Sequence, residues 1–125
     1  MGVNGSRVDN ISQGGICCGV DADGRLKPVA YNYKGESFDI HPTTGVHFSD
    51  VVIPNFDKII QMVTETHPYI PDFRLVSWDV AMDEDGIPML VEANLCYGEL
   101  NLHQPCNGPI FGDNTQLVLD EVFHR

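Results

Sequence analysis

Positive charge is scarce in this sequence of 125 residues, where 7 lysines and arginines stand against 18 aspartates and glutamates and the formal net charge is −11. Nucleic-acid binding needs a cationic surface, so this balance argues against nucleic acid as a partner. Long apolar runs are also lacking, and none approaches the roughly 18 residues of a membrane span. The first residues, MGVNGSRVDN, show no apolar segment of a secretory signal. We therefore expect a cytoplasmic protein without a membrane span.

The four cysteines lack the spacing of a common zinc site. Cys96, His103 and Cys106 contain no pair of cysteines two to four residues apart, which disfavours zinc. Cys17 and Cys18 lie in an apolar run and are expected in a buried strand. Without a secretory signal, free thiols are the expected state of all four.

The length is that of one domain, and we expect residues 1–125 to form it. A chain of this size buries about two thirds of its unfolded surface. Its hydrophobic content of 42% fits a globular domain.

The most informative stretch runs from Phe73 to Asn94 and is predicted to form a β-hairpin. Two β-rich runs flank Asp85-Gly86, a dipeptide typical of two-residue hairpin turns. Closing the chain there places Asp79 opposite Glu92. It also sets three other pairs: Glu84 with Ile87, Met82 with Met89, and Val80 with Val91. Because side chains alternate between faces, one face is a predicted core surface of Trp78, Val80, Met82, Ile87, Met89, Val91 and Ala93.

The opposite face of this hairpin carries Asp79, Glu92, Asn94 and, among its apolar residues, Leu90. Directly opposed carboxylates would lie about 5 Å apart at Cβ and destabilise the pair. A cation between them removes that cost, and carboxylate and amide oxygens suit Mg²⁺. The alternative is a solvated face with scattered acids. A four-residue loop would make the acids diagonal, and a three-residue loop would break the pairing unless a bulge restored it.

The remaining patterns predict an α+β fold. Residues 16–20 and 26–33 indicate a second hairpin around the turn cluster 21–24. Residues 54–67 indicate the main helix, with Asn55 as N-cap and an apolar stripe that covers the Trp78 face. Residues 115–124 indicate a last helix opened by a capping box at Asp113 to Gln116, with Leu117, Leu119, Val122 and Phe123 partly buried. We therefore expect an antiparallel sheet of hairpins packed on one main helix, plus a C-terminal helix.

Two loop regions are candidates for ligand contacts. The Gly14-Gly15 pair permits close approach of backbone to a ligand, and Arg7 is suited to a phosphate oxygen. An ordinary glycine-rich loop is the alternative. The stretch of about twenty residues after Asn94 is rich in Gly, Pro and Asn and is expected to line the substrate side, where Gly98 would let backbone N–H groups approach a phosphate or an acceptor.

The hairpin pattern D-x(12)-E-x-N resembles the C-terminal metal-binding motif of the ATP-grasp superfamily. The wider string WDVAMDEDGIPMLVEAN resembles the sugar-transfer-associated branch. The resemblance implies that Asp79, Glu92 and Asn94 hold the Mg²⁺ ions that bridge the phosphates of ATP. It makes Leu90 a candidate floor for the adenine.

Three further segments resemble elements of that family. The run Arg7-x-x-Asn10-x-x-x-Gly14-Gly15 resembles an element beside the phosphates and the acceptor. His41 lies in a segment that resembles a His-Pro-x-Thr-Gly motif, which would give it an acceptor contact or a proton-shuttle role. Gln104 resembles a recurrent glutamine of the branch, with no role that the residues themselves define.

The family phosphorylates a carboxylate, and an amine or similar nucleophile then attacks the acyl phosphate. The resemblance covers only the C-terminal portion of the ATP-grasp fold, because no segment resembles the earlier lobe with its phosphate-binding lysines and adenine hinge. We therefore expect the C-terminal, ATP- and Mg²⁺-binding lobe of a carboxylate–amine ligase that is inactive alone. It would bind ATP and a small-molecule acceptor and pair with the missing N-terminal lobe or with a second copy.

The branch looks like one associated with polysaccharide and capsule biosynthesis, and its members carry names such as hexapeptide transferase. Two other classes stay open. One is a metal-dependent hydrolase, against which stands the lack of a histidine-rich cluster. The other is a non-catalytic interaction module.

Overall fold

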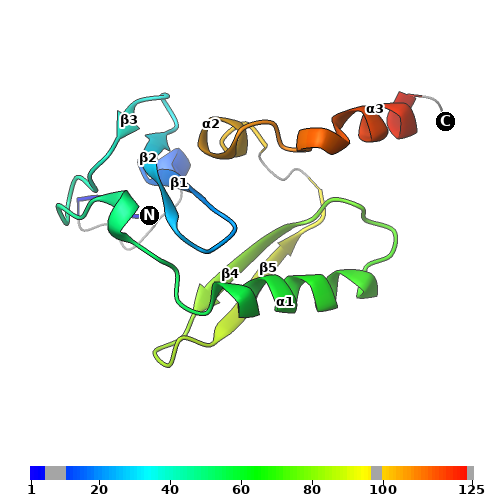
Figure 1. The fold of residues 1–125 in the computed structure, drawn as a ribbon, viewed down its shortest axis with the longest axis horizontal. Helices are drawn as coiled ribbons and strands as arrows, with labels where there is room; N and C mark the ends of the chain where they lie inside the picture. The colour runs from blue at the N-terminus through cyan, green and yellow to red at the C-terminus, as the bar shows by residue number, and fades with distance from the viewer. Residues whose placement is uncertain (5–10, 97–99, 124–125) are drawn as a thin grey trace.

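The computed structural model describes residues 1–4, 11–96 and 100–123. Within them the protein is α+β, as predicted, with two antiparallel sheets and three α-helices. Figure 1 shows the first sheet and the helix α2 (His103–Asn107) in the upper part of the view, and the second sheet with the helix α1 (Phe56–Thr66) below them. The predicted single sheet of hairpins is therefore two separate sheets. Among the described residues, no helix is long and apolar enough to cross a bilayer.

The first sheet confirms the predicted second hairpin and adds a short edge strand. Its order is β1 (Ile16–Val20), β2 (Leu26–Asn32) and β3 (Ser37–Phe38), all antiparallel. The β1–β2 turn closes with the Gly24 N–H donating to the Asp21 carbonyl at 2.9 Å. Gly24 has φ of 82°, and a Cβ there would lie 2.6 Å from the Phe56 Cβ, so this turn requires glycine.

The buried core lies at this first sheet. Its apolar members are Ile16, Leu26, Ala30 and Phe48, the last from the short 3₁₀ helix η2 (Phe48–Asp50). Helix α2 (His103–Asn107) contacts β1 and β2. A Cβ at Gly19 would collide with the Cys106 carbonyl oxygen, so the absence of a side chain lets α2 sit directly on β1.

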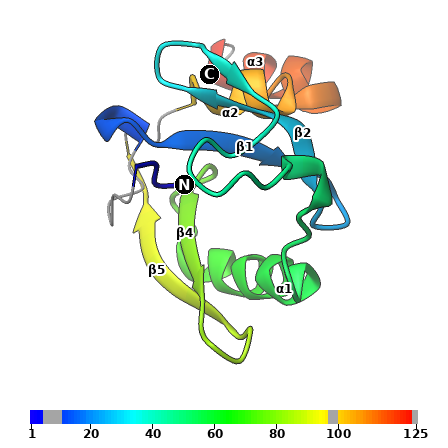
Figure 2. The ribbon, with the colours of Figure 1, turned by 90° about the vertical axis from the view of Figure 1, so that its left-hand side faces the viewer.

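The second sheet is the predicted central hairpin, β4 (Ser77–Met82) with β5 (Pro88–Asn94). Helix α1 (Phe56–Thr66) lies along one face of it, followed by the 3₁₀ helix η3 (His67–Tyr69) (Figure 2). The His67 ring meets Trp78 edge-on at 6.1 Å between ring centroids, which places Trp78 on the helix side as predicted. Alternation then leaves the Asp79 side of the strand free of this helix.

Two predicted helix caps do not form. Asn55 precedes α1 but makes no capping bond, because its backbone is left-handed (φ 51°) and its side chain turns to the hairpin instead. Asp113 and Gln116 do not form a capping box. The 3₁₀ helix η4 (Gly112–Asn114) leads into α3 (Thr115–Phe123), and Gln116 Nε2 donates to Asp120 Oδ1 at 2.7 Å. The remaining short element is the 3₁₀ helix η1 (Ile11–Gln13).

Two further expectations were wrong. The stretch after Asn94 is not all loop, since it contains α2. The apolar residues of α3 are exposed rather than partly buried, because this helix has few neighbours beyond η4; they are Leu117, Leu119, Val122 and Phe123.

Candidate metal centre

The β4–β5 turn has three residues rather than the two predicted. Asp83 pairs with Ile87, whose carbonyl accepts the Asp83 N–H at 3.0 Å, and Glu84, Asp85 and Gly86 form the loop. Asp83 Oδ1 also accepts the N–H groups of Asp85 at 3.0 Å and Ile87 at 2.7 Å. Gly86 supplies the positive φ of 73° that such a loop needs. The Asp83 carboxylate therefore organises the turn from inside.

A β-bulge in β5 compensates for the additional residue in the loop and restores the predicted register beyond it. Beyond the turn the pairs are Met82 with Pro88, Ala81 with Met89 and Val80 with Leu90. The register then shifts by one residue between Asp79 and Val80, so Val91 is extra and Asp79 faces Glu92. The predicted Asp79–Glu92 pair is confirmed, whereas the predicted pairs of Val80 with Val91, Met82 with Met89 and Glu84 with Ile87 are wrong.

Between the three-residue loop and the bulge, Met89 and Leu90 lie on the faces opposite to those predicted. Because cross-strand partners share a face, Leu90 lies with Val80 and Trp78, and Met89 lies with Ala81 on the Asp79 face. The prediction that Leu90 stands beside Glu92 on the same face is therefore wrong. Met89 and Val91 are 47% and 66% exposed, so the predicted core face is only partly buried.

Three oxygen-bearing side chains lie near the open end of the hairpin, away from the turn. Asp79 and Glu92 are directly paired and exposed, and Asn94, paired with Ser77, is half-buried. The Asn94 amide Nδ2 lies 3.5 Å from Asp79 Oδ2, at the outer limit of a hydrogen bond. Among the described residues, neither carboxylate has an ion-pair partner. The repulsion between them is therefore not offset by a cationic side chain of the described chain.

This donor set fits Mg²⁺. Two carboxylates and an amide do not complete a metal cage, and no group of three His, Cys, Asp or Glu residues in the described chain is placed to hold a metal. Mg²⁺, however, is usually held by one or two carboxylates, and phosphate oxygens and waters fill the other positions. The arrangement therefore suits a metal that arrives with a phosphate ligand.

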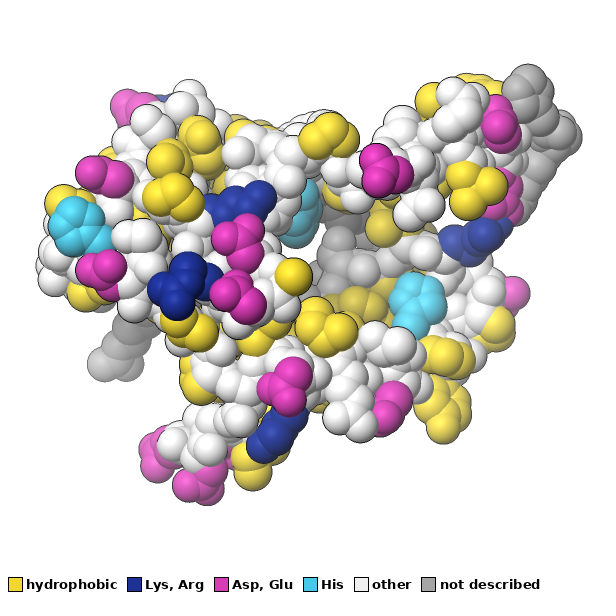
Figure 3. Space-filling view, viewed as in Figure 1, with side chains coloured by type: hydrophobic (Ala, Val, Ile, Leu, Met, Phe, Trp, Pro, Cys, Tyr) yellow, Lys and Arg dark blue, Asp and Glu magenta, His cyan; other side chains and the backbone are white. Residues whose placement is uncertain are grey.

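A side-chain contact ties the hairpin turn to the main helix. Asn55 Nδ2 donates to the Gly86 carbonyl at 2.7 Å, so the start of α1 holds the loop that determines the register. Figure 3 shows acidic side chains at this tip of the molecule, where Asp83, Glu84 and Asp85 follow one another.

The predicted phosphate-binding residues are only partly described. Arg7, Asn10 and Gly98 lie outside the described residues. Gly14 has φ of 94° and open space where a Cβ would stand, and Gly15 is buried. Both precede β1 in the first sheet, whereas the carboxylates belong to the second. Their role at a phosphate stays a prediction.

His41 is buried and both its ring nitrogens are engaged. Nδ1 accepts the Thr44 N–H at 3.2 Å and the Thr43 N–H at 3.4 Å, so the proton lies on Nε2, which donates to the Gly2 carbonyl at 3.1 Å. The ring therefore holds a loop together. A contact with an acceptor stays a prediction and requires one of these bonds to open. Gln104 has an exposed side chain on α2, and its role also stays a prediction.

The thiols show no zinc arrangement within the described residues. Cys106 is buried, and its Sγ donates to the Cys17 carbonyl at 3.4 Å. Burial, together with the neighbouring Cys17, raises the pKa of the Cys106 thiol to about 12. Burial also raises the pKa of Cys18. Cys96, in contrast, is exposed.

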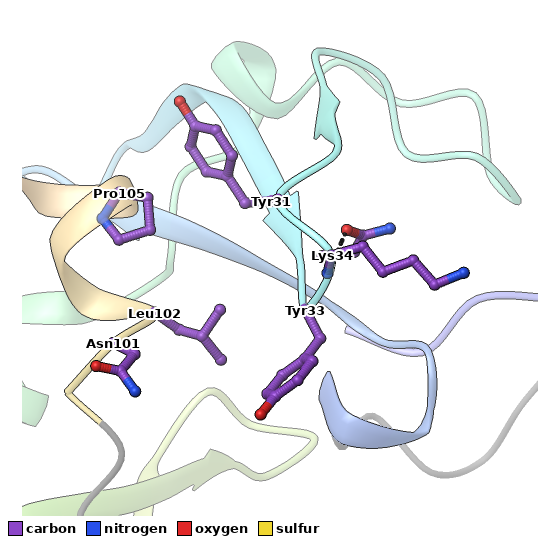
Figure 4. Close-up of a pocket in the computed structure, with 8 residues that line it drawn as sticks. Tyr31, Tyr33, Lys34, Asn101, Leu102 and Pro105 are labelled. Carbon is purple, nitrogen blue, oxygen red and sulfur yellow. Dashed lines mark hydrogen bonds between the residues drawn. The ribbon is translucent and has the colours of Figure 1, made fainter.

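Sequence reasoning missed a hollow of about 510 Å³ between the end of β2 and the start of α2 (Figure 4). Its principal side chains are Tyr31, Tyr33, Asn101, Leu102 and Pro105. The available signal was a pair of tyrosines at alternate positions directly before the Lys34-Gly35 turn.

Comparison with known proteins gives one family. A model of the family described as sugar-transfer associated ATP-grasp matches residues 1–118. Neither the curated proteins nor the solved structures give a match. The match spans most of the sequence and agrees with the resemblance carried by the hairpin motif. The chain therefore belongs to the sugar-transfer-associated ATP-grasp family.

Proposed function

We propose that this chain is the metal- and phosphate-binding C-terminal lobe of an ATP-dependent carboxylate–amine ligase, or of a ligase with a similar nucleophile. The observation that carries the proposal is the direct pairing of Asp79 with Glu92 on adjacent strands, with the Asn94 amide beside Asp79. Three oxygen donors on a strand pair are a rigid platform for a cation. Family membership supports ATP as the phosphate source.

In this proposal the three side chains bind and orient, and they do not transfer protons. Bound Mg²⁺ would neutralise charge on the phosphoryl group that moves from ATP to the carboxylate. Asp79 and Glu92 supply the negative charge that holds the cation, and Asn94 fixes the Asp79 carboxylate by its amide. The remaining nucleotide contacts, such as lysines at the phosphates, come from outside these 125 residues.

The finer assignment follows from the family context. We propose that the ligase acts in polysaccharide or capsule biosynthesis, in agreement with the sugar-transfer association of the family. The label hexapeptide transferase would then describe neighbouring enzymes rather than chemistry of this chain.

Isothermal titration with ATP and Mg²⁺ tests the site. We expect weak, Mg²⁺-dependent binding, because the net charge of −11 opposes a polyanionic nucleotide. Asp79→Asn and Glu92→Gln should each weaken binding about tenfold or more, the effect expected for a lost metal contact. The matched control is Asp72→Asn, which removes an exposed carboxylate outside the hairpin. Equal weakening by all three variants would show a general charge effect and contradict the metal site.

A second candidate is a non-catalytic interaction module. The observation that favours it is the exposure of apolar side chains on both faces of β5, where Met89, Leu90 and Val91 are 47%, 42% and 66% exposed. Sedimentation would then show self-association that Leu90→Ser weakens. A phosphate-release assay on the chain combined with an N-terminal ATP-grasp lobe separates the candidates, since turnover by the mixture favours the ligase lobe and its absence favours the non-catalytic module. Steady turnover by these 125 residues alone would contradict both the non-catalytic role and the proposal of a lobe that is inactive alone.

A further inference from the structure

The hollow between β2 and α2 has two aromatic walls and an apolar floor. Figure 4 shows Tyr33 at one end and Tyr31 at the other, with Leu102 between them on the α2 side and Pro105 above; the two tyrosine hydroxyls point in opposite directions. The Asn101 amide lies across the hollow from Tyr33. The hollow therefore offers ring faces and aliphatic groups inside and polar atoms at its edge.

The turn that carries Tyr33 is held rigidly. Asn32 Oδ1 accepts the N–H groups of Lys34 at 2.9 Å and Glu36 at 3.0 Å, and Asn32 Nδ2 donates to Glu36 Oε2 at 2.5 Å. The Gly35 N–H donates to the Asn32 carbonyl at 3.0 Å. Tyr33 is nevertheless 62% exposed. A rigid turn that presents an exposed ring lowers the entropic cost of binding at that ring.

The polar atoms at the edge are available to a ligand. Within the described chain, the hydroxyls of Tyr31 and Tyr33 and the side-chain amide of Asn101 have no hydrogen-bond partner. Lys34 extends away from the hollow, and no carboxylate lines it. The hollow thus provides donors and acceptors without a formal charge, which favours a neutral occupant.

We propose that this hollow binds a neutral, polyhydroxylated ring such as a pyranose. A pyranose has C–H faces that stack on an aromatic ring such as Tyr33 and a rim of hydroxyls that would reach the Tyr33 hydroxyl and the Asn101 amide at the same end of the hollow (Figure 4). A charged sugar phosphate is disfavoured by the net charge of −11. The binding claim stands apart from the metal site, whereas a role of this ring as the acceptor rests on the proposed ligase function.

Amide NMR titrations of the full chain test the proposal. The probes are methyl glycosides of glucose, galactose, mannose and N-acetylglucosamine, each up to about 10 mM, for an expected dissociation constant on the order of 1 mM. At least one should shift the amide signals of Tyr33, Asn101 and Leu102. EDTA in the buffer removes any contribution of a metal, so failure here is distinct from failure of the Mg²⁺ site.

Three variants make the result specific. Tyr33→Ala should weaken binding about tenfold or more, and Tyr33→Phe, which keeps the ring, should weaken it less. Tyr69→Ala is the matched control, since Tyr69 is 86% exposed and lies outside the hollow, and it should change nothing. The proposal is overturned by the absence of shifts with all four glycosides, by shifts that Tyr33→Ala leaves intact, or by uridine binding here more tightly than every glycoside.

Discussion

The two sheets of this molecule differ in what stabilises them. The β1–β2–β3 sheet and η2 provide the buried apolar side chains, of which Ala30 and Phe48 are 0% and 2% exposed. Neither β4 nor β5 has a buried residue. The hairpin is stabilised instead by backbone pairing, by the Asp83 turn and by contact with α1. The difference teaches that the hairpin with the candidate metal centre depends on local hydrogen bonds and on α1, and not on a core of its own.

The largest expected contrast comes from the same substitution in each sheet. Leu26→Ala should lower the free energy of unfolding by about 2–5 kcal/mol, because Leu26 is 8% exposed in the core. Leu90→Ala should lower it by about 1 kcal/mol or less, because Leu90 is 42% exposed. Urea denaturation of both variants measures the contrast. Equal losses would show that the hairpin has a core and would break the comparison.

Thiol reactivity should follow the same division. Iodoacetamide near pH 8 should modify exposed Cys96 at least ten times faster than Cys106, which is buried and whose pKa is raised to about 12. Peptide mass mapping over time measures both rates. Similar rates at the two cysteines would mean that α2 does not stay seated on β1.

The raised pKa of Cys106 also predicts a pH dependence of stability. Below pH 9.0 the thiol is protonated in both the folded and the unfolded state, and its contribution is fully present. Between pH 9.0 and about 12 the unfolded thiol ionises while the folded one stays neutral, so stability falls as the pH rises. Denaturation curves across this range should fall less steeply for Cys106→Ala than for the wild type, and identical slopes would contradict the shift.

A smaller effect is expected at the hairpin turn. Asp83→Ala removes the acceptor of two N–H groups and should cost about 1–2 kcal/mol of stability. Asp85→Ala removes the same charge from the same loop, but the Asp85 side chain has no partner in the described chain, so it should cost about 0.5 kcal/mol or less. Amide NMR should also show loss of the Asp79–Glu92 pairing in Asp83→Ala alone. An intact pairing there would show that α1 and the bulge fix the register without the turn.

The sequence correctly predicted the hairpin and the Asp79–Glu92 pair, but it did so by assuming a two-residue loop, whereas the loop has three residues. Asp85-Gly86 favours a two-residue turn locally, but the Asp83 carboxylate stabilises a three-residue loop by accepting two N–H groups. The loop alone would move the carboxylates out of register, and the bulge restores them. The bulge is not readable from the residues, because it is a property of how β5 meets β4. Leu90 was assigned to the wrong face because it lies between the three-residue loop and the bulge, where the register differs from the predicted one.

Other errors came from tertiary contacts that periodicity does not report. Asn55 has the composition of an N-cap, but its side chain reaches Gly86 instead. The motif around His41 likewise did not show that the fold closes over its ring, and the acceptor contact of His41 stays a prediction. The tyrosine hollow was missed because its walls come from segments about seventy residues apart in the chain, Tyr31 to Gly35 and Asn101 to Pro105.

The most direct test of the central claim is the Mg²⁺ dependence of thermal unfolding in the wild type and in Asp79→Asn. In metal-free buffer the variant should be as stable as the wild type or more so, because it removes a like-charge pair. Mg²⁺ at about 100 times its dissociation constant should stabilise the wild type by about 2.7 kcal/mol and the variant by less. Asp72→Asn should respond as the wild type does. An equal response to Mg²⁺ in all three proteins would contradict a metal site at Asp79 and Glu92.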